Sequence, residues 1–147
     1  MSLRISIISK LFFISLAPFL FTSCANQKSF QCQKILQIAT NVTKETRSLT
    51  TDKSSENIDK KTWLLAADKI EQGSEDLKKL AVNDPNLQQY KTSFAQVYQD
   101  YADATRQIIK VLDSKDKEAA KAAQEKVRKA AQLEKEVGSK FNIYCKN

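Results

Sequence analysis

The most regular apolar pattern in the chain follows Asn83-Asp84-Pro85. Asp84 can cap the free amides at the start of a helix, and Pro85 suits the first helical position. From there apolar or small residues recur at alternating steps of three and four, at Leu87, Tyr90, Phe94, Val97, Tyr101, Ala104, Ile108 and Val111. This spacing, kept over about four heptads, predicts one long helix with a single apolar seam.

A less regular version of the pattern precedes this helix. We expect a helix that begins after Ser54-Ser55 and ends by Val82, weakened near its middle by Gly73. Its apolar positions are Trp63 or Leu64, Ala67, Ile70, Leu77, and Leu80 or Ala81.

Another helix is predicted at the carboxyl end of the chain. Asp113-Ser114 supply its start signals, and Asp116 and Glu118 place negative charge in its first turn, which suits the helix dipole. Its seam consists of Ala120, Ala123, Val127, Ala130, Leu133 or Glu134, Val137, Phe141 and Tyr144.

The first helix of the set is shorter and ends by Leu49, and residues 50–57 form a polar loop after it. Its apolar positions are Cys32, Ile35, Ala39 and Val42. No such helix is stable alone, because each apolar stripe must be covered by the others. Four amphipathic segments with short connections predict an all-α fold, an up-down-up-down four-helix bundle.

The amino end of the chain has the form of an export signal. Arg4 and Lys10 are basic without any acidic neighbour, residues 11–21 are apolar, and residues 22–25 are mostly small. The apolar run is shorter than the roughly 20 residues that a transmembrane helix needs. We therefore expect export without a permanent membrane span.

The short motif at the end of this signal resembles the lipobox of bacterial lipoproteins, and it reads Leu20-Phe21-Thr22-Ser23-Cys24. Phe21 stands where that family prefers Leu. The resemblance implies cleavage before Cys24, a diacylglyceryl group on its sulfur, and anchoring on the extracytoplasmic side, periplasmic or at the cell surface. Cleavage after Ala25 is the alternative, and it would release a soluble secreted protein.

The lipoprotein interpretation divides the chain into three parts. Residues 1–23 are the signal peptide, residues 24–29 a lipidated tether, and residues 30–147 the helical bundle domain. The chain has three cysteines, so acylation of Cys24 leaves Cys32 and Cys145 as a pair. The topology brings both to the same end of the bundle. We expect a Cys32–Cys145 disulfide in an oxidising compartment, with two free thiols as the alternative.

Composition excludes several classes of function but does not identify one. Loss of two basic residues with the signal lowers the net charge from +7 to +5, which is too diffuse for nucleic acid but suits an anionic lipid surface. The chain has no histidine, the usual general base and the commonest zinc or haem ligand. No phosphate-binding or dinucleotide motif appears. We expect no catalysis, no metal and no cofactor.

Three groups of side chains carry candidate chemistry. The carboxylate pairs Glu71/Glu75 and Asp100/Asp103 have the spacing of solvated helix charges. The aromatic residues Tyr90, Phe94, Tyr98 and Tyr101 are interpreted as core, with a pocket for an apolar ligand as the alternative. Tyr98 lies off the seam, and we expect it to be the most exposed of the four.

The basic row forms the third group. Its members share one face of the last helix and are Lys117, Lys121, Arg128 and Lys135. This candidate interaction face would meet anionic lipid or an acidic partner. Glu118, Glu125 and Lys129 lie among them, as on an ordinary solvated face.

From these observations we predict that the protein is a membrane-anchored, non-catalytic accessory or scaffold subunit of a membrane complex. In general form the chain is similar to the small extrinsic lipoproteins of cyanobacterial photosynthetic complexes, such as the Q-type subunit of photosystem II. One alternative is a carrier or sensor whose bundle opens around an apolar ligand. Another is a surface lipoprotein that binds host or competitor molecules.

Overall fold

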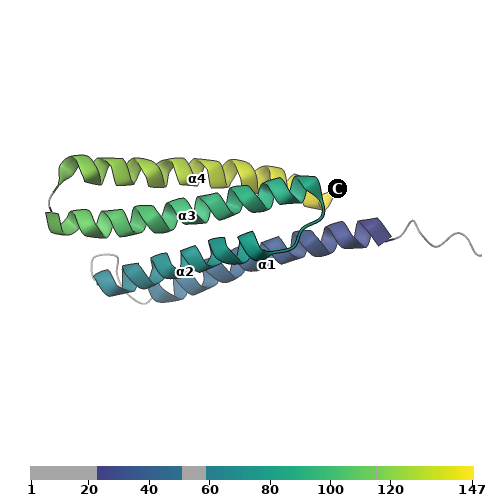
Figure 1. The fold of residues 1–147 in the computed structure, drawn as a ribbon, viewed down its shortest axis with the longest axis horizontal. Helices are drawn as coiled ribbons and strands as arrows, with labels where there is room; N and C mark the ends of the chain where they lie inside the picture. Colours follow the sequence, from purple (N-terminus) through teal and green to yellow (C-terminus); the bar gives the residue numbers. More distant parts are fainter. Residues whose placement is uncertain (1–22, 51–58, 115) are drawn as a thin grey trace, which may run out of the picture.

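The structure is a computed structural model that describes residues 23–50, 59–114 and 116–147. Its four helices lie along one long axis (Figure 1) and are α1 (Ser23–Thr50), α2 (Lys60–Lys79), α3 (Pro85–Ser114) and α4 (Lys117–Lys146). The predicted all-helical fold is confirmed for these residues. The predicted signal segment up to residue 22 and residues 51–57 of the predicted loop lie outside them, whereas Thr50 is the last residue of α1. No described helix has an apolar stretch long enough to cross a membrane.

Aspartates cap three of the helices. The Asp84 carboxylate accepts hydrogen bonds from the backbone amides of Asn86 and Leu87, so the predicted start of α3 at Pro85 is confirmed. Asp59 and Asp116 cap α2 and α4 in the same way. Both helices therefore start later than predicted, because the capping aspartate lies downstream of the serines that served as start signals.

Helix α1 begins nine residues before the predicted Cys32, at Ser23, so residues 24–29 are helical. Polar contacts hold these turns where the apolar pattern is absent. The Lys28 ammonium lies 4.2 Å from the centroid of the Tyr144 ring, a cation–π contact. The Gln31 side-chain oxygen accepts from the amide of Asn83 at 2.8 Å. The assignment of residues 24–29 as a lipidated tether stays a prediction.

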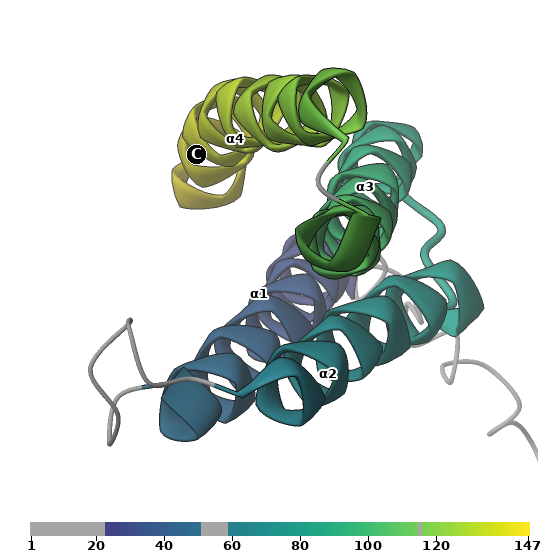
Figure 2. The same cartoon turned by 90° about the vertical axis from the view of Figure 1, so that its left-hand side faces the viewer.

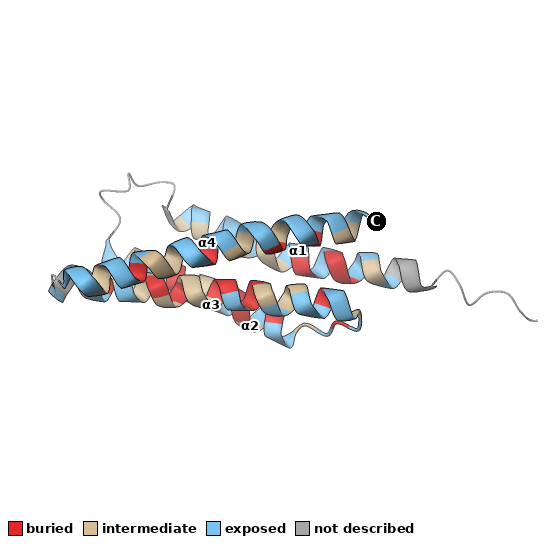
Figure 3. Cartoon of the chain, turned by 90° about the horizontal axis from the view of Figure 1, so that it is seen from above, coloured by how far each residue is buried: buried red, intermediate tan, exposed pale blue. Residues whose placement is uncertain are grey.

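Helix α3 lies at the centre of the core, in extensive contact with α2 and α4, whereas α1 packs on α2 and barely contacts α4. Seen end-on (Figure 2), the four helices form an arc that is open between α1 and α4. Burial follows the facing sides of the helices, and much of the outer surface of α4 is exposed (Figure 3). The fully buried side chains of the core include Ile35, Leu77, Leu87 and Val97.

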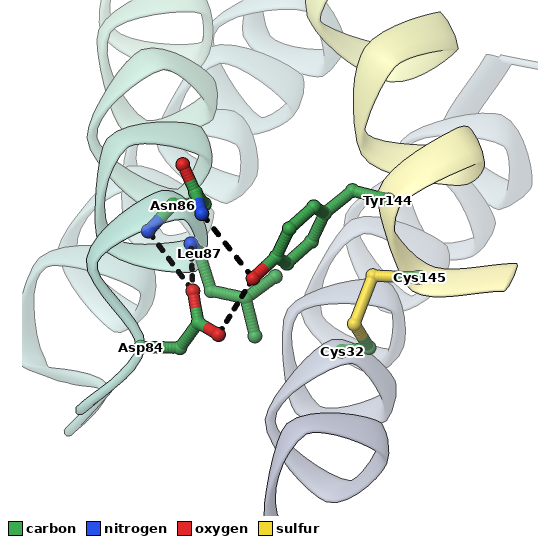
Figure 4. The surroundings of a disulfide bond; sticks show 6 residues. All are labelled: Cys32, Asp84, Asn86, Leu87, Tyr144 and Cys145. Atoms are coloured by element: carbon green, nitrogen blue, oxygen red, sulfur yellow. Dashed lines mark hydrogen bonds between the residues drawn. A yellow bond between two sulfur atoms is a disulfide. The ribbon is translucent and has the colours of Figure 1, made fainter. Parts of the chain in front are cut away.

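A disulfide joins α1 to α4 at one end, which we call the disulfide end. The Cα atoms of Cys32 and Cys145 are 6.0 Å apart, and the predicted pairing is present. Beside it, the Tyr144 hydroxyl donates to the second Asp84 oxygen at 2.7 Å, and Asn86 donates to the Tyr144 hydroxyl at 3.3 Å (Figure 4). Side chains from α3, α4 and α1 thus join the helices here.

Gly73 explains how α1 and α2 approach each other. A Cβ atom at this position would overlap a methyl group of Val42. The sequence indicated only that this glycine weakens α2, but the structure shows that its missing side chain makes room for the facing helix.

Candidate functional site

A groove of about 770 Å³ runs along the open side of the arc between α1 and α4, and we call it the α1–α4 groove. Phe94 and Tyr98 of α3 and Phe141 of α4 form its apolar floor. Ile35, Leu36 and Ala39 form the α1 wall, and the polar residues nearer the end away from the disulfide include Thr43, Lys44, Arg47, Ser48 and Glu134.

The groove exists because α1 packs on α2 but makes few contacts with α4, to which the disulfide joins it at one end. Among its described side chains, those that are buried are Gln31, Cys32 and Ile35. From Leu36 onward no described α1 side chain is fully buried, and Leu36 itself is 53% exposed on the groove wall. A four-helix arrangement would normally cover this face with the fourth helix. Here α4 makes few contacts with α1, so much of the α1 face that lies toward α4 is left open.

Aromatic rings pack against one another in and beside the floor of the groove. The Phe94 and Phe141 rings meet edge to face with their centroids 5.5 Å apart, and Tyr90 packs against Phe141 at 5.8 Å. Such T-shaped pairs add to the stability that comes from buried area alone. The floor is therefore a packed aromatic surface that an apolar group can contact.

Tyr98 is 5% exposed, so the prediction that it would be the most exposed of the four aromatic residues is wrong. A single heptad seam describes the buried positions of a helix that packs against one neighbour. Helix α3 has both α2 and α4 against it and also meets α1, so its buried surface includes positions on either side of the seam, such as Ala95, Tyr98 and Ala102.

One lining residue of the groove, Glu134, belongs to a polar pair. The Tyr101 hydroxyl donates to Glu134 at 2.8 Å and so links α3 to α4. Burial, together with the smaller effect of the Glu134 charge, raises the pKa of Tyr98 to about 12. Burial and the hydrogen bond to Glu134 also raise the pKa of Tyr101. Both phenols therefore stay neutral over the physiological range of pH.

The raised pKa of Tyr98 predicts a loss of stability at alkaline pH. An unfolded tyrosine ionises near pH 10, so the stability that neutral Tyr98 contributes is complete below pH 10 and is lost as pH rises toward about 12. At pH 11 we expect the free energy of unfolding of the wild type to fall by about 1 kcal/mol more than that of Tyr98→Phe. Urea unfolding of both proteins at pH 8 and pH 11 measures it. Equal losses of stability in the two proteins between pH 8 and pH 11 would contradict the raised pKa of Tyr98.

Gly138 lines the groove and has open space beside it. A Cβ atom added there would have no heavy atom within 4 Å. We expect Gly138→Ala to stabilise the protein by about 0.5–1 kcal/mol, because alanine is the better helix former and nothing obstructs its methyl group. Thermal unfolding measures this gain. A destabilised variant would mean that the groove is filled at this point.

The candidate carboxylate pairs do not line the groove. Glu71 receives hydrogen bonds from Arg106 at 2.7 Å and from Gln99, and the bond from Arg106 is the main reason that its pKa is lowered. Asp100 and Asp103 both lie within 4.0 Å of the Lys126 ammonium. These carboxylates connect α2, α3 and α4 on the outside of the bundle.

Glu75, the other half of the first pair, belongs to the same outer surface. Its carboxylate accepts from the Lys78 ammonium at 2.8 Å. That hydrogen bond is the main reason that its pKa is lowered.

One member of the basic row, Lys135, lies close in sequence to the α4 residues that line the α1–α4 groove, and the other three lie nearer the amino end of α4, outside that lining. Lys135 lies three residues before Gly138 and seven before Asn142, a helical spacing that places the three on one face, and the last two line the groove. The four members, Lys117, Lys121, Arg128 and Lys135, are all exposed. Arg128 pairs with Glu125 at 2.7 Å. None of the four members is among the lining residues of the groove, so the role of the row as an interaction face stays a prediction.

Two signals in the sequence point to the groove in retrospect. Leu36 is a large apolar residue off the α1 stripe, and Gly138 stands inside the predicted last helix, where a better helix former would be expected. Cys24, the predicted lipid attachment site, lies in the first turn of α1, on the helix that forms one wall of the groove, and its side chain is outside the described part.

The groups that line the groove suit binding. Its floor is aromatic, its α1 wall is apolar near the disulfide end, and polar or charged groups line much of the rest. Recognition sites commonly combine such a surface with a few polar groups. Comparison with protein-family models, with curated proteins and with solved structures gave no match.

Proposed function

We propose that this protein is a non-catalytic accessory subunit, anchored by lipid on Cys24 at the extracytoplasmic side of a membrane, which docks onto a membrane complex through the α1–α4 groove. One observation carries the proposal: an aromatic, apolar surface lies open along a helix face that a four-helix bundle would normally cover. In this proposal the helices follow an up-down-up-down order, and the groove is the uncompleted contact between first and last.

The lipobox resemblance supports the membrane setting. Helix α1 carries Cys24 in its first turn and forms a wall of the groove further along, so anchor and docking surface share one rigid element. A diacyl anchor would also raise the local concentration of the protein around a membrane partner, so that a modest groove is sufficient for stable association.

A carrier of an apolar ligand is the second candidate. The volume of about 770 Å³ falls within the range of small-molecule sites, and the floor is aromatic. The groove is open to solvent along its length, so it would leave one side of an apolar molecule in contact with water. Extraction of the purified protein followed by mass spectrometry tests this candidate, which requires a stoichiometric apolar molecule.

Purification from native membranes in mild detergent, after brief chemical crosslinking, tests the proposal. We expect one complex to accompany the wild type and to be lost with Gly138→Trp, whose indole would fill the groove. Ala122→Trp is the matched control, because Ala122 is an exposed residue of α4 that does not line the groove. Cys24→Ala should deplete the complex by releasing the protein from the membrane. Equal recovery of a complex with both tryptophan variants would overturn the role of the groove.

A further inference from the structure

We infer that the α1–α4 groove accepts a single amphipathic helix of about four turns whose flanks are acidic. This rests on the proposed function, since it specifies the chemistry of the partner that the groove would take. The length of the groove, its open side and the charges beside it point to such a partner.

The length of the groove matches a short helical segment. Its α1 wall runs from Ile35 to Ser48, which corresponds to about 20 Å at the helical rise of about 1.5 Å per residue. A partner helix of about 14 residues would cover this distance. Apolar residues at every third or fourth position of such a helix would meet Leu36, Ala39 and the aromatic floor.

The open side favours a helix over an acyl chain. A helix satisfies its own backbone hydrogen bonds and presents a polar face to water when its apolar face is buried. An acyl chain in the same position would keep much of its surface in water and lose that part of the hydrophobic stabilisation. The open side of the α1–α4 groove therefore suits a further helix that lies between α1 and α4.

Positive charge lies on both the α1 side and the α4 side of the α1–α4 groove. On α1, Lys44 and Arg47 line the groove, and Lys44 is exposed. On α4, exposed Lys135 shares the face of Gly138 and Asn142. Acidic side chains on the flanks of the bound helix would approach these cations, which favours association and selects for an acidic partner.

Cations outnumber carboxylates among the described residues that line the groove. Glu134 is the carboxylate in that lining, against Lys44 and Arg47, and it accepts a hydrogen bond from the Tyr101 hydroxyl. Glu45 follows Lys44 but forms its ion pair with Lys69 of α2 at 3.0 Å, outside the groove. Glu136 pairs with Lys140, and neither lines the groove.

Two synthetic peptides test the inference. Both have 14 residues with leucine at alternating steps of three and four, and their remaining positions are glutamate and glutamine in one and lysine and glutamine in the other. Fluorescence anisotropy would measure binding to the full mature protein in phosphatidylcholine nanodiscs, with empty nanodiscs subtracted. We expect the acidic peptide to bind with a dissociation constant at least tenfold lower, and the difference to shrink in about 0.5 M salt.

Variants locate the binding and separate charge from shape. Gly138→Trp should abolish binding of both peptides, whereas Ala122→Trp should not. The double variant Lys44→Glu/Lys135→Glu should reverse the preference for the acidic peptide. Lys61→Glu/Lys110→Glu makes the same change in net charge at exposed positions outside the groove, and it should leave the preference unchanged.

Several results would overturn the inference. They are equal binding of the two peptides, a preference for the basic one, no binding of either, and occupation of the groove by dodecanoate or by a second copy of the chain in their place. The membrane purification with Gly138→Trp requires no peptide. A complex that is lost in that experiment while no peptide binds would therefore leave the proposed function standing and reject only the acidic helix.

Discussion

Reduction of the Cys32–Cys145 disulfide should lower the free energy of unfolding by about 2–5 kcal/mol. The bond closes a chain separation of 113 residues, so its loss restores a large conformational entropy to the unfolded state. It is also the covalent link between α1 and α4, which otherwise touch little. The folded state loses its main attachment between these two helices at the same time as the unfolded state gains freedom.

Urea unfolding with and without reductant measures this effect, and Cys32→Ser/Cys145→Ser serves as the control. The double variant should match the reduced wild type and show no response to reductant. The reduced protein should also lose binding at the α1–α4 groove, because the wall that α1 forms depends on that attachment. A wild type that is equally stable in both redox states would contradict the structural role of the bond.

Gly73→Leu should destabilise the protein by about 3 kcal/mol, the upper part of the range for an overpacked core. Even Gly73→Ala should cost about 1 kcal/mol, although alanine is the better helix former by a similar amount. The reason is that the added Cβ would overlap Val42, a β-branched residue whose side chain has one strongly preferred rotamer in a helix. The two helices would have to separate to accept it.

A double-mutant cycle isolates this contact. Val42→Ala alone should destabilise by about 1 kcal/mol, but in the Gly73→Ala background it should cost less or even stabilise, since it removes the overlapping methyl group. Gly138→Ala provides the matched comparison, because the same substitution in α4 meets open space and should have the opposite sign. Additive effects of Val42→Ala and Gly73→Ala would show that the two residues are not in contact.

Periodicity in the sequence predicted the helical part of the fold well. The α3 seam contains Leu87, Phe94, Val97 and Ala104 among its buried members, and the α4 seam contains Ala123, Ala130, Val137 and Phe141. The disulfide pairing also followed from sequence, because helix order alone predicts which ends meet. These features depend on local spacing and on topology, both of which can be deduced from one chain.

The groove could not be predicted in this way, because it depends on how far one helix stands from another. The apolar stripe of α1 is the same whether α4 covers it or not. Likewise, the burial of Tyr98 and the early start of α1 depend on contacts with neighbouring helices, through the second face of α3 and through Gln31 and Lys28. Trp63 and Leu64, predicted for the α2 stripe, are exposed for reasons that the contacts do not explain.

The continuity of α1 sets the height at which the protein would meet its partner. With lipid on Cys24 and α1 upright, helical rise places Ile35 about 17 Å and Ser48 about 36 Å above the anchored residue. No flexible spacer lies between Cys24 and the groove to shorten this distance, since the helix is unbroken from Ser23. The segment that docks there would project well beyond the lipid headgroups, in a loop or a peripheral domain of the complex instead of its membrane-embedded part.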